Sequence, residues 1–458
     1  MRKNFMVRAC LLAMVMVLPG LAEDHYILKL RTASSISQVC TNHGVNVLRA
    51  MSGSATGIFV VAVPSGPLSS SVLRSLADDP NVSGVEADSQ VALPELAGVP
   101  VRASGQSTLP PLFNPNQNTP YYGTMAWDPY VNQPAVWTIG VDIAHMFSTG
   151  QGAVVAVIDT GVDPNNAILK PVLTGGYDFT REVPGGSEMA DVNQSTTEVL
   201  DQSTTEVLDY TNAVVLTLNQ STTEVLDQST TEVLDQSTTE VLDATPPPAA
   251  FGHGTMTAGL VHLVAPQALL MPLKAFSGDG TATVSAVVQA VYYAVDNGAN
   301  VISMSFSATQ NSSALQAAVQ FAIQNGVVPV AAVGNSGIQT TQIYPASYTN
   351  VLGIASVNDQ DQRSTFSNYG SGLVSLAAPG EGVITTYPGT NNYAAGWGTS
   401  FSTPLVAGGA ALLFQLNQQA GPQAVETALE NGAVNVGQGL GSGVVSLAPA
   451  IWDFESHH

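Results

Sequence analysis

Cysteine and positive charge are both scarce in this sequence. Only Cys10 and Cys40 occur among the 458 residues, so no disulfide framework is expected and an apolar core must hold the fold. Lys and Arg together number 12 against 34 Asp and Glu, which gives a formal net charge of −22. This acidic balance argues against nucleic-acid binding and against adhesion to anionic membranes.

Apolar runs long enough to cross a membrane are missing as well. The basic start Met1-Arg2-Lys3 is followed by an apolar run over residues 9–18 and then by Leu21-Ala22. A transmembrane anchor, the alternative, needs about 20 apolar residues. We therefore expect residues 1–22 to be a signal peptide that is removed, and the product to be secreted, extracellular and free of the membrane.

Residues 23–93 predict a small α+β module. Strand-like runs cover 26–30 and 57–63, a helical pattern covers 68–76, and an extended piece covers 82–93. Taken alone, this pattern also fits an ordinary small domain of unknown role. Residues 94–120 contain six prolines and predict an exposed linker, where a precursor could be cut.

The region 121–451 alternates buried strands with helices, and residues 452–458 are expected to form a C-terminal tail. This alternation predicts an α/β fold, a doubly wound parallel sheet with helices on both faces and active residues at strand ends and helix starts. The expected strands are 154–158, 301–304, 327–333 and 351–357, and the expected helices are 284–295, 314–324 and 403–416.

An acidic repeat block interrupts this pattern. The octapeptide QSTTEVLD occurs five times within residues 194–243. One interpretation is a solvated loop that no core needs. The others are a short stack of Thr/Val-rich strands or a weak cation site built from spaced carboxylates. None of these three interpretations gives the repeat block a role in catalysis.

Two segments deliver an acid and a histidine. Five apolar residues precede Asp159, which predicts a carboxylate at the C-terminal end of a buried strand that needs a partner. His253 lies between two glycines at the start of a helical run, and the missing side chains let a substrate approach closely. Asp159 alone could equally be a helix cap, and His253 alone a structural residue.

The strongest motif is Gly398-Thr399-Ser400-Phe401-Ser402-Thr403-Pro404, which leads into a run of small residues. A serine hydroxyl is a weak nucleophile and needs a general base within hydrogen-bond reach. At a helix N-terminus it also gains backbone N–H groups that favour an oxyanion. The alternative is a serine that only caps a buried helix.

The segments around Asp159, His253 and Ser400, in that order, resemble the subtilisin-like serine proteases. The resemblance implies a triad in which Asp159 orients His253 and His253 takes the proton of Ser400. It also implies that Asn335, in Gly334-Asn335-Ser336-Gly337, donates to the oxyanion. No metal or organic cofactor is required for this chemistry. Residues 23–93 resemble, more weakly, the inhibitory propeptide of such enzymes.

The same resemblance suggests how a polypeptide substrate binds. Ser305, Phe306 and Ser307 match the strand that pairs with an extended substrate, and Gly278 looks like the facing edge. Gly334 belongs to the same groove, and Ile343 falls near the floor of the main specificity pocket. Bulk at Ser307 and Ile343 predicts a preference for small or medium apolar residues at the cleavage site.

The resemblance implies that a structural calcium ion is found in many relatives, but we expect the usual site to be absent here. The segment after His253 has no ion-binding loop, and Ile168 occupies the place of the expected acid. A different ion on the repeats or on Asp359 and Asp361 stays open. We expect a monomeric, self-processing endopeptidase inhibited by its own propeptide; the alternative is a catalytically silent surface or binding protein of the same fold.

Overall fold

In a computed structural model, the chain is described over residues 23–66, 69–94, 118–192, 209–210, 213–216 and 248–457. It divides into two compact units. The first comprises residues up to Met51 together with Gly57–Ala87, and the second comprises Ser52–Thr56 and Asp88–His458.

The smaller unit is a four-stranded antiparallel sheet with two helices packed on it, in the strand order β2-β3-β1-β4. Val39 of α1 and Leu76 of α2 are fully buried with Leu28 and Val61 of the sheet. The predicted elements occur in the predicted order, and the structure adds the helix α1 and the edge strand β2 between the first two strand-like runs. Their bounds are β1 Glu23–Leu30, α1 Ile36–His43, β2 Asn46–Ala50, β3 Ile58–Pro64, α2 Ser69–Ala77 and β4 Val82–Ala87.

The larger unit is built on an eight-stranded sheet in the order β10-β9-β13-β8-β15-β16-β17-β18. All neighbours pair in parallel except β9 and β10. The strands are β8 Val154–Asp159, β9 Tyr177–Asp178, β10 Val183–Pro184, β13 Leu269–Lys274, β15 Val301–Met304, β16 Val328–Ala332, β17 Leu352–Val357 and β18 Leu376–Pro379. The chain adds strands to one side of β8 and then to the other. A crevice at such a reversal, beyond the carboxyl ends of the strands, is where active residues are expected.

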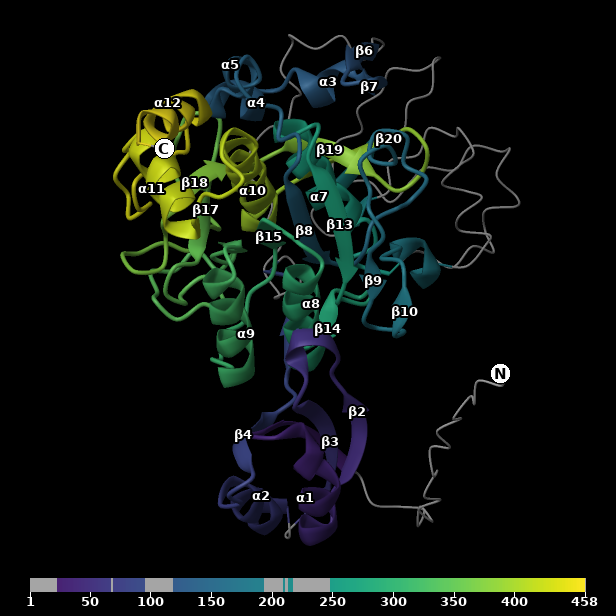
Figure 1. Ribbon diagram of the computed structural model, residues 1–458. Coiled ribbons are helices and arrows are strands. Elements are labelled where there is room, and N and C mark those ends of the chain that lie inside the picture. Colours follow the sequence, from purple (N-terminus) through teal and green to yellow (C-terminus); the bar gives the residue numbers. More distant parts are fainter. Residues whose placement is uncertain are drawn as a thin grey trace, which may run out of the picture. The chain divides into compact units, whose positions relative to one another are not determined.

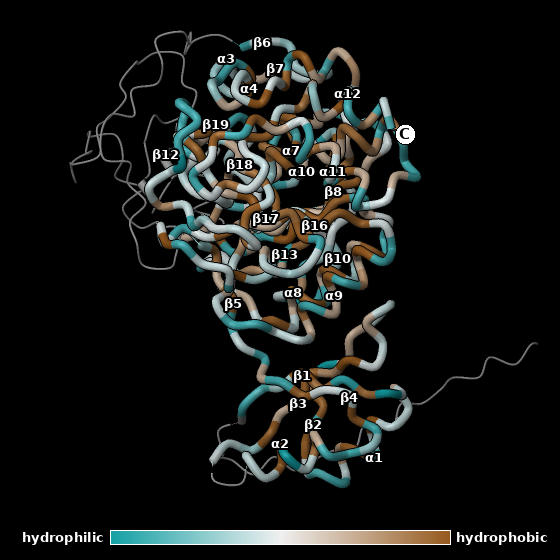
Figure 2. Tube along the Cα trace, turned by 90° about the vertical axis from the view of Figure 1, so that its left-hand side faces the viewer, coloured by the Kyte–Doolittle hydropathy of each residue, from teal (hydrophilic) through white to brown (hydrophobic). Residues whose placement is uncertain are grey.

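Two pairs of helices cover the sheet (Figure 1). One pair is α7 (His253–Val264) and α10 (Thr399–Leu416), and the other is α8 (Val284–Asp296) and α9 (Ser313–Gln324). α7 and α10 are buried along almost their whole length. Their sequences are therefore mostly apolar on all sides of the helix. Figure 2 shows the apolar residues gathered along the central strands such as β16 and β17. The predicted doubly wound α/β fold is confirmed.

The remaining elements surround this core. They are β5 Gln90–Ala92, β6 Asn118–Tyr121, β7 Thr124–Trp127, α3 Asp128–Val131, α4 Pro134–Ile139, α5 Val141–Ala144, β11 Asp209–Tyr210, β12 Ala213–Leu216, β14 Thr281–Thr283, β19 Val383–Tyr387, β20 Asn392–Gly396, α11 Pro422–Gly432 and α12 Leu447–His457. Among the residues that the structure describes, no helix is long and apolar enough to span a bilayer.

Four predicted boundaries differ from the structure. α10 begins at Thr399 rather than at residue 403, and α12 runs through the predicted tail because Phe454 is buried in the core. β6 begins inside the predicted linker, where it pairs with β7. β5 belongs to the second unit rather than to the N-terminal module, because it pairs with β14.

Two described strands, β11 and β12, lie within the range of the repeat block and pair with each other. β12, in the spacer between the second and third copies, pairs antiparallel with β20. Apart from Asp209, the QSTTEVLD copies lie outside the described residues, so their interpretation stays open.

Candidate active site

Asp159 and His253 form a buried hydrogen-bonded pair. Asp159 is the last residue of β8 and His253 the first of α7, and they are 1% and 7% exposed. His253 Nδ1 lies 2.7 Å from Asp159 Oδ1. Because an ionised carboxylate can only accept, this bond places the ring proton on Nδ1 and leaves Nε2 as the basic nitrogen.

The Asp159 carboxylate is held by two further donors. Its Oδ1 accepts from the Thr160 N–H at 2.7 Å, and its Oδ2 accepts from the Thr257 hydroxyl at 3.2 Å. Thr257 lies one turn after His253 on the same helix. The sequence analysis did not single out Thr257, although its spacing from His253 places both on neighbouring turns of α7.

Ser400 stands in the first turn of α10, directly after Gly398-Thr399. Its hydroxyl donates to the Ser305 carbonyl at 3.0 Å, and the Ser305 hydroxyl donates back to the Ser400 carbonyl at 2.9 Å. The rings of Phe401 and His253 lie 5.6 Å apart, so the starts of α7 and α10 meet. The Ser400 hydroxyl thus donates to the Ser305 carbonyl rather than to His253, and catalytic hydrogen bonds often tighten only when substrate binds.

Asn335 follows β16 and is oriented by Thr399. Its side-chain oxygen accepts from the Thr399 N–H at 2.9 Å and from the Thr399 hydroxyl at 2.8 Å. The Thr399 hydroxyl in turn accepts from the Gly334 N–H at 3.2 Å. Because the amide oxygen is fixed by these donors, the amide NH₂ is the end that can donate to an oxyanion. Thr399 is therefore a positioning residue that the sequence analysis quoted within its motif but assigned no role.

An extended segment of the chain lies in the expected groove. β5 pairs antiparallel with β14, and the Leu93 N–H donates to the Gly280 carbonyl at 3.1 Å. On the opposite side, the Ser307 N–H donates to the Ala92 carbonyl at 3.3 Å. The groove between β14 and Ser307 thus binds a strand through backbone bonds on both sides.

Two of the predicted groove residues play other parts. The Gly278 carbonyl accepts from the Ala250 N–H, so the edge of the groove is formed by Gly280 and β14 rather than by Gly278. Phe306 is fully buried, with its ring 5.2 Å from that of Phe276, so its side chain belongs to the core.

Ser307 lies beside Gly334, and Ile343 lies next to the residue that pairs with Ala308. Gly334 has φ +89°, and a Cβ there would lie 3.5 Å from the Ser307 hydroxyl and 2.8 Å from Asn368 Nδ2. Ile343 is 5% exposed and precedes Tyr344, which forms an antiparallel bridge with Ala308. A side chain on residue 334 itself would therefore be crowded by Asn368 and Ser307.

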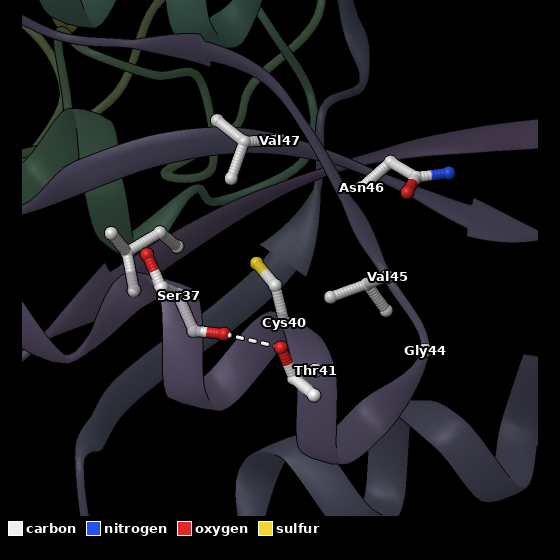
Figure 3. A pocket seen from close by; sticks show the side chains of 8 residues that line it. Ser37, Cys40, Thr41, Gly44, Val45, Asn46 and Val47 are labelled. Atoms are coloured by element: carbon white, nitrogen blue, oxygen red, sulfur yellow. Dashed lines mark hydrogen bonds between the residues drawn. The ribbon is translucent and has the colours of Figure 1, made fainter. Parts of the chain in front are cut away.

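A hollow on the surface of the smaller unit is not lined by an acid, base and nucleophile of this kind. It is lined by α1 and β2, and Figure 3 shows Cys40 there with Ser37, Thr41 and Val47. Burial raises the pKa of the Cys40 thiol, so it stays protonated and a poor nucleophile. The bond drawn joins the Thr41 hydroxyl to the Ser37 carbonyl and only supports the helix.

No group of three or more metal-ligating side chains occurs within the described part of the chain. Ile168 is 1% exposed in the apolar core, and α7 ends at Val264 without an ion-binding loop. An apolar side chain at position 168 supplies no ligand for a cation, and calcium binding by this chain stays an open expectation.

Comparisons with known proteins agree with this geometry. The model of the subtilase family matches residues 150–446. Thermitase from Thermoactinomyces vulgaris is 33% identical over 327 residues, which cover 69% of this chain and 91% of thermitase. Subtilisin Savinase from Lederbergia lenta is 38% identical over 210 residues, which cover 43% of this chain and 77% of the relative.

Among solved structures, fervidolysin from Fervidobacterium pennivorans, a keratinolytic enzyme related to subtilisin, has the same fold. Its TM-score is 0.66 at 20% identity, and the match covers 95% of this chain and 62% of fervidolysin. The predicted family is thus confirmed by sequence and by fold: this chain belongs to the subtilase family and is a serine peptidase.

Proposed function

We propose that this chain is a secreted endopeptidase that is made as a self-processing precursor and acts through an acyl-enzyme on Ser400. The observation that carries the proposal is the 2.7 Å bond between His253 and Asp159 beside the start of α10. An acid, a base and a hydroxyl in this relation form the triad arrangement of acyl transfer.

The geometry supports a definite order of steps. The Ser400 hydroxyl leaves the Ser305 carbonyl, its proton passes to His253 Nε2, and its oxygen bonds to the scissile carbonyl carbon. The oxyanion accepts from the Asn335 amide and the Ser400 N–H. The C–N bond then breaks as His253 protonates the leaving amine. Water, deprotonated by His253, hydrolyses the ester and restores Ser400, while Asp159 stabilises the imidazolium.

A fluorophosphonate probe tests the nucleophile. The mature wild-type enzyme should be labelled and the Ser400→Ala variant should not. Labelling of neither protein would favour the alternative of a silent binding protein with this fold, whereas equal labelling of both would remove Ser400 as the nucleophile.

Endopeptidase action is supported by the way in which the groove binds the backbone of an extended strand. A groove that hydrogen-bonds to both sides of an extended strand recognises the peptide backbone and does not require a free chain terminus. A fluorogenic peptide blocked at both termini should therefore be cut. Cleavage only of peptides with a free terminus would indicate an exopeptidase.

Self-processing is supported by β5, because the chain's own residues already occupy the groove. We expect the first cut soon after Leu93, at the beginning of the predicted linker 94–120. The purified Ser400→Ala precursor should stay full length, whereas the wild type should shorten, and mass spectrometry of the wild type gives the new N-terminus. Shortening of the purified variant would contradict self-processing.

Specificity for small or medium apolar residues is supported by Ser307, which lies beside Gly334, and by the buried Ile343. Ile343→Gly should open the pocket and raise kcat/KM for peptides with Phe before the cut, relative to Ala, by about 10-fold or more. An unchanged ratio would remove Ile343 from the specificity pocket.

Secretion rests on residues 1–22, which lie outside the described residues. Expression of the full chain and of a chain starting at Glu23 should place only the former in the medium. Appearance of both in the medium in equal amounts would remove the support for a signal peptide.

A further inference from the structure

A buried carboxyl group stands at the start of the helix that carries His253. Glu188, in the short 3₁₀ helix Glu188–Asp191, is fully buried. Its Oε2 accepts from the Gly252 N–H at 2.8 Å, and its Oε1 accepts from the Thr255 N–H at 3.2 Å and from the Thr255 hydroxyl. Gly252 is the N-cap of α7 and has no side chain to bond these amides. Glu188 therefore caps α7 from another part of the chain.

The same carboxyl group reaches the segment that carries Asp159. Glu188 Oε2 accepts from the Thr160 hydroxyl at 3.1 Å, and that hydroxyl accepts from the Gly254 N–H at 2.9 Å. Thr160 directly follows Asp159 and donates its own N–H to the Asp159 carboxylate. Glu188 thus connects the end of β8 to the first turn of α7, two elements that pack side by side (Figure 1).

The charges around Glu188 are few and buried. Burial raises the pKa of Glu188 to about 7, while its hydrogen bonds and the nearby Lys274 lower it. Lys274, on β13, is fully buried and donates to the Thr160 carbonyl at 2.7 Å and to Asp191.

The other charged side chains near Glu188 bond to partners other than Glu188. Asp191 also pairs with Arg181. The Asp163 carboxylate accepts from the Asn165 and Gly389 N–H groups, and Asp159 faces His253. Glu188 is therefore the carboxyl group that faces the amides at the start of α7.

Negative charge at this place has a chemical consequence. The N-terminus of a helix carries a partial positive charge, which disfavours a protonated imidazole on its first residue. His253 is the first residue of α7 and must become protonated during acyl transfer. A carboxylate at the same terminus opposes the helix dipole and so favours that protonation.

We propose that Glu188 is a positioning residue for the Asp159–His253 pair: it fixes the start of α7 against the end of β8 and supplies the negative charge that favours protonated His253. This inference rests on the proposed peptidase mechanism. It assigns a role to a residue that lies 65 positions before His253, on the other side of the repeat block, where neither motif nor spacing points to it.

The main test is Glu188→Gln in the full chain, with kcat and KM measured against pH. We expect kcat to fall about 10- to 100-fold, because the pair is less well held, with KM changed little. The acid limb of the kcat profile should move down, by less than about half a pH unit, because Glu188 carries its negative charge only in the part of the limb above its pKa of about 7, and loss of that charge makes His253 harder to protonate. Glu430→Gln is the matched control, a half-buried carboxyl group on α11 whose loss should change neither quantity.

A second pair of variants decides the matter if Glu188→Gln does not fold. Thr160→Val removes the hydroxyl between Glu188 and Gly254, whereas Thr160→Ser keeps it. The Val variant should lose about 10-fold in kcat with KM unchanged, and the Ser variant, which restores the hydroxyl, should recover this loss. Equal kcat for Val and Ser, or an unshifted acid limb in Glu188→Gln, would overturn the inference. Failure of the wild type to react with the fluorophosphonate probe would instead refute the proposed function.

Discussion

His262 gives the sharpest prediction about stability against pH. It lies near the end of α7, is fully buried, and has its ring 5.8 Å from that of Tyr121 in an edge-to-face arrangement. Neither of its ring nitrogens has a hydrogen-bond partner within the described structure. Burial, with a smaller effect of His145, lowers the pKa of His262 from 6.5 to about 4.

The direction of the effect follows from where the proton binds. Between pH 6.5 and pH 4 the unfolded chain protonates His262 and the folded chain does not, so the free energy of unfolding falls as the pH falls. A pKa lowered from 6.5 to about 4 corresponds to a loss of about 3 kcal/mol across this interval. Above pH 6.5 the ring is neutral in both states and contributes no pH dependence.

His262→Leu should remove this loss, because leucine fills a similar volume and binds no proton. Urea unfolding of the Ser400→Ala chain, which cannot digest itself, is measured with and without His262→Leu at several pH values from 7.5 to 4. The fall in unfolding free energy over this range should be about 3 kcal/mol smaller in the Leu variant. His25→Leu, at an exposed histidine, serves as the control. Equal falls with and without His262→Leu would refute the buried, unpartnered state of His262.

Three further predictions concern the site and its surroundings. Asn335→Ala should lower kcat about 100- to 1,000-fold with a small change in KM, the magnitude known for the corresponding donor of subtilisin; a loss below 10-fold would argue against an oxyanion role. Gly254→Ala should destabilise the fold by about 3 kcal/mol or more in urea unfolding, because a Cβ there would lie 1.9 Å from the Gly161 carbonyl oxygen; wild-type stability would contradict this packing. EDTA should leave the Tm of the enzyme unchanged, because Ile168 stands where an acidic ligand would be needed; a marked fall in Tm would reveal an ion site elsewhere.

Local pattern was enough to predict most of the fold. The apolar runs that became β8, β15 and β17 and the periodic segments that became α8 and α9 were predicted nearly to the residue. These elements are buried strands or amphipathic helices, whose composition is dictated by the faces that they bury. The motifs around Asp159, His253 and Ser400 also indicated the family, because each combines a reactive side chain with the small residues that its backbone requires.

Boundaries that depend on distant partners could not be predicted in this way. β5 continues the N-terminal module in sequence, yet it pairs with β14, nearly 200 residues further along the chain. The early start of α10 and the helical end of the chain likewise depend on packing, since Ser400 and Phe454 are buried by other elements. Periodicity alone carries no information about such partners.

The sequence by itself determined the family, the fold class and the candidate triad of Asp159, His253 and Ser400, because each of these residues lies in a short motif of its own. The tertiary structure alone decided what holds these side chains in place. Thr399 orients Asn335, and Glu188 joins the segments of Asp159 and His253. Glu188 lies outside every motif. Because Gly252 has no side chain to cap α7, the amides at the start of this helix are left for a carboxyl group from a distant part of the chain to bond.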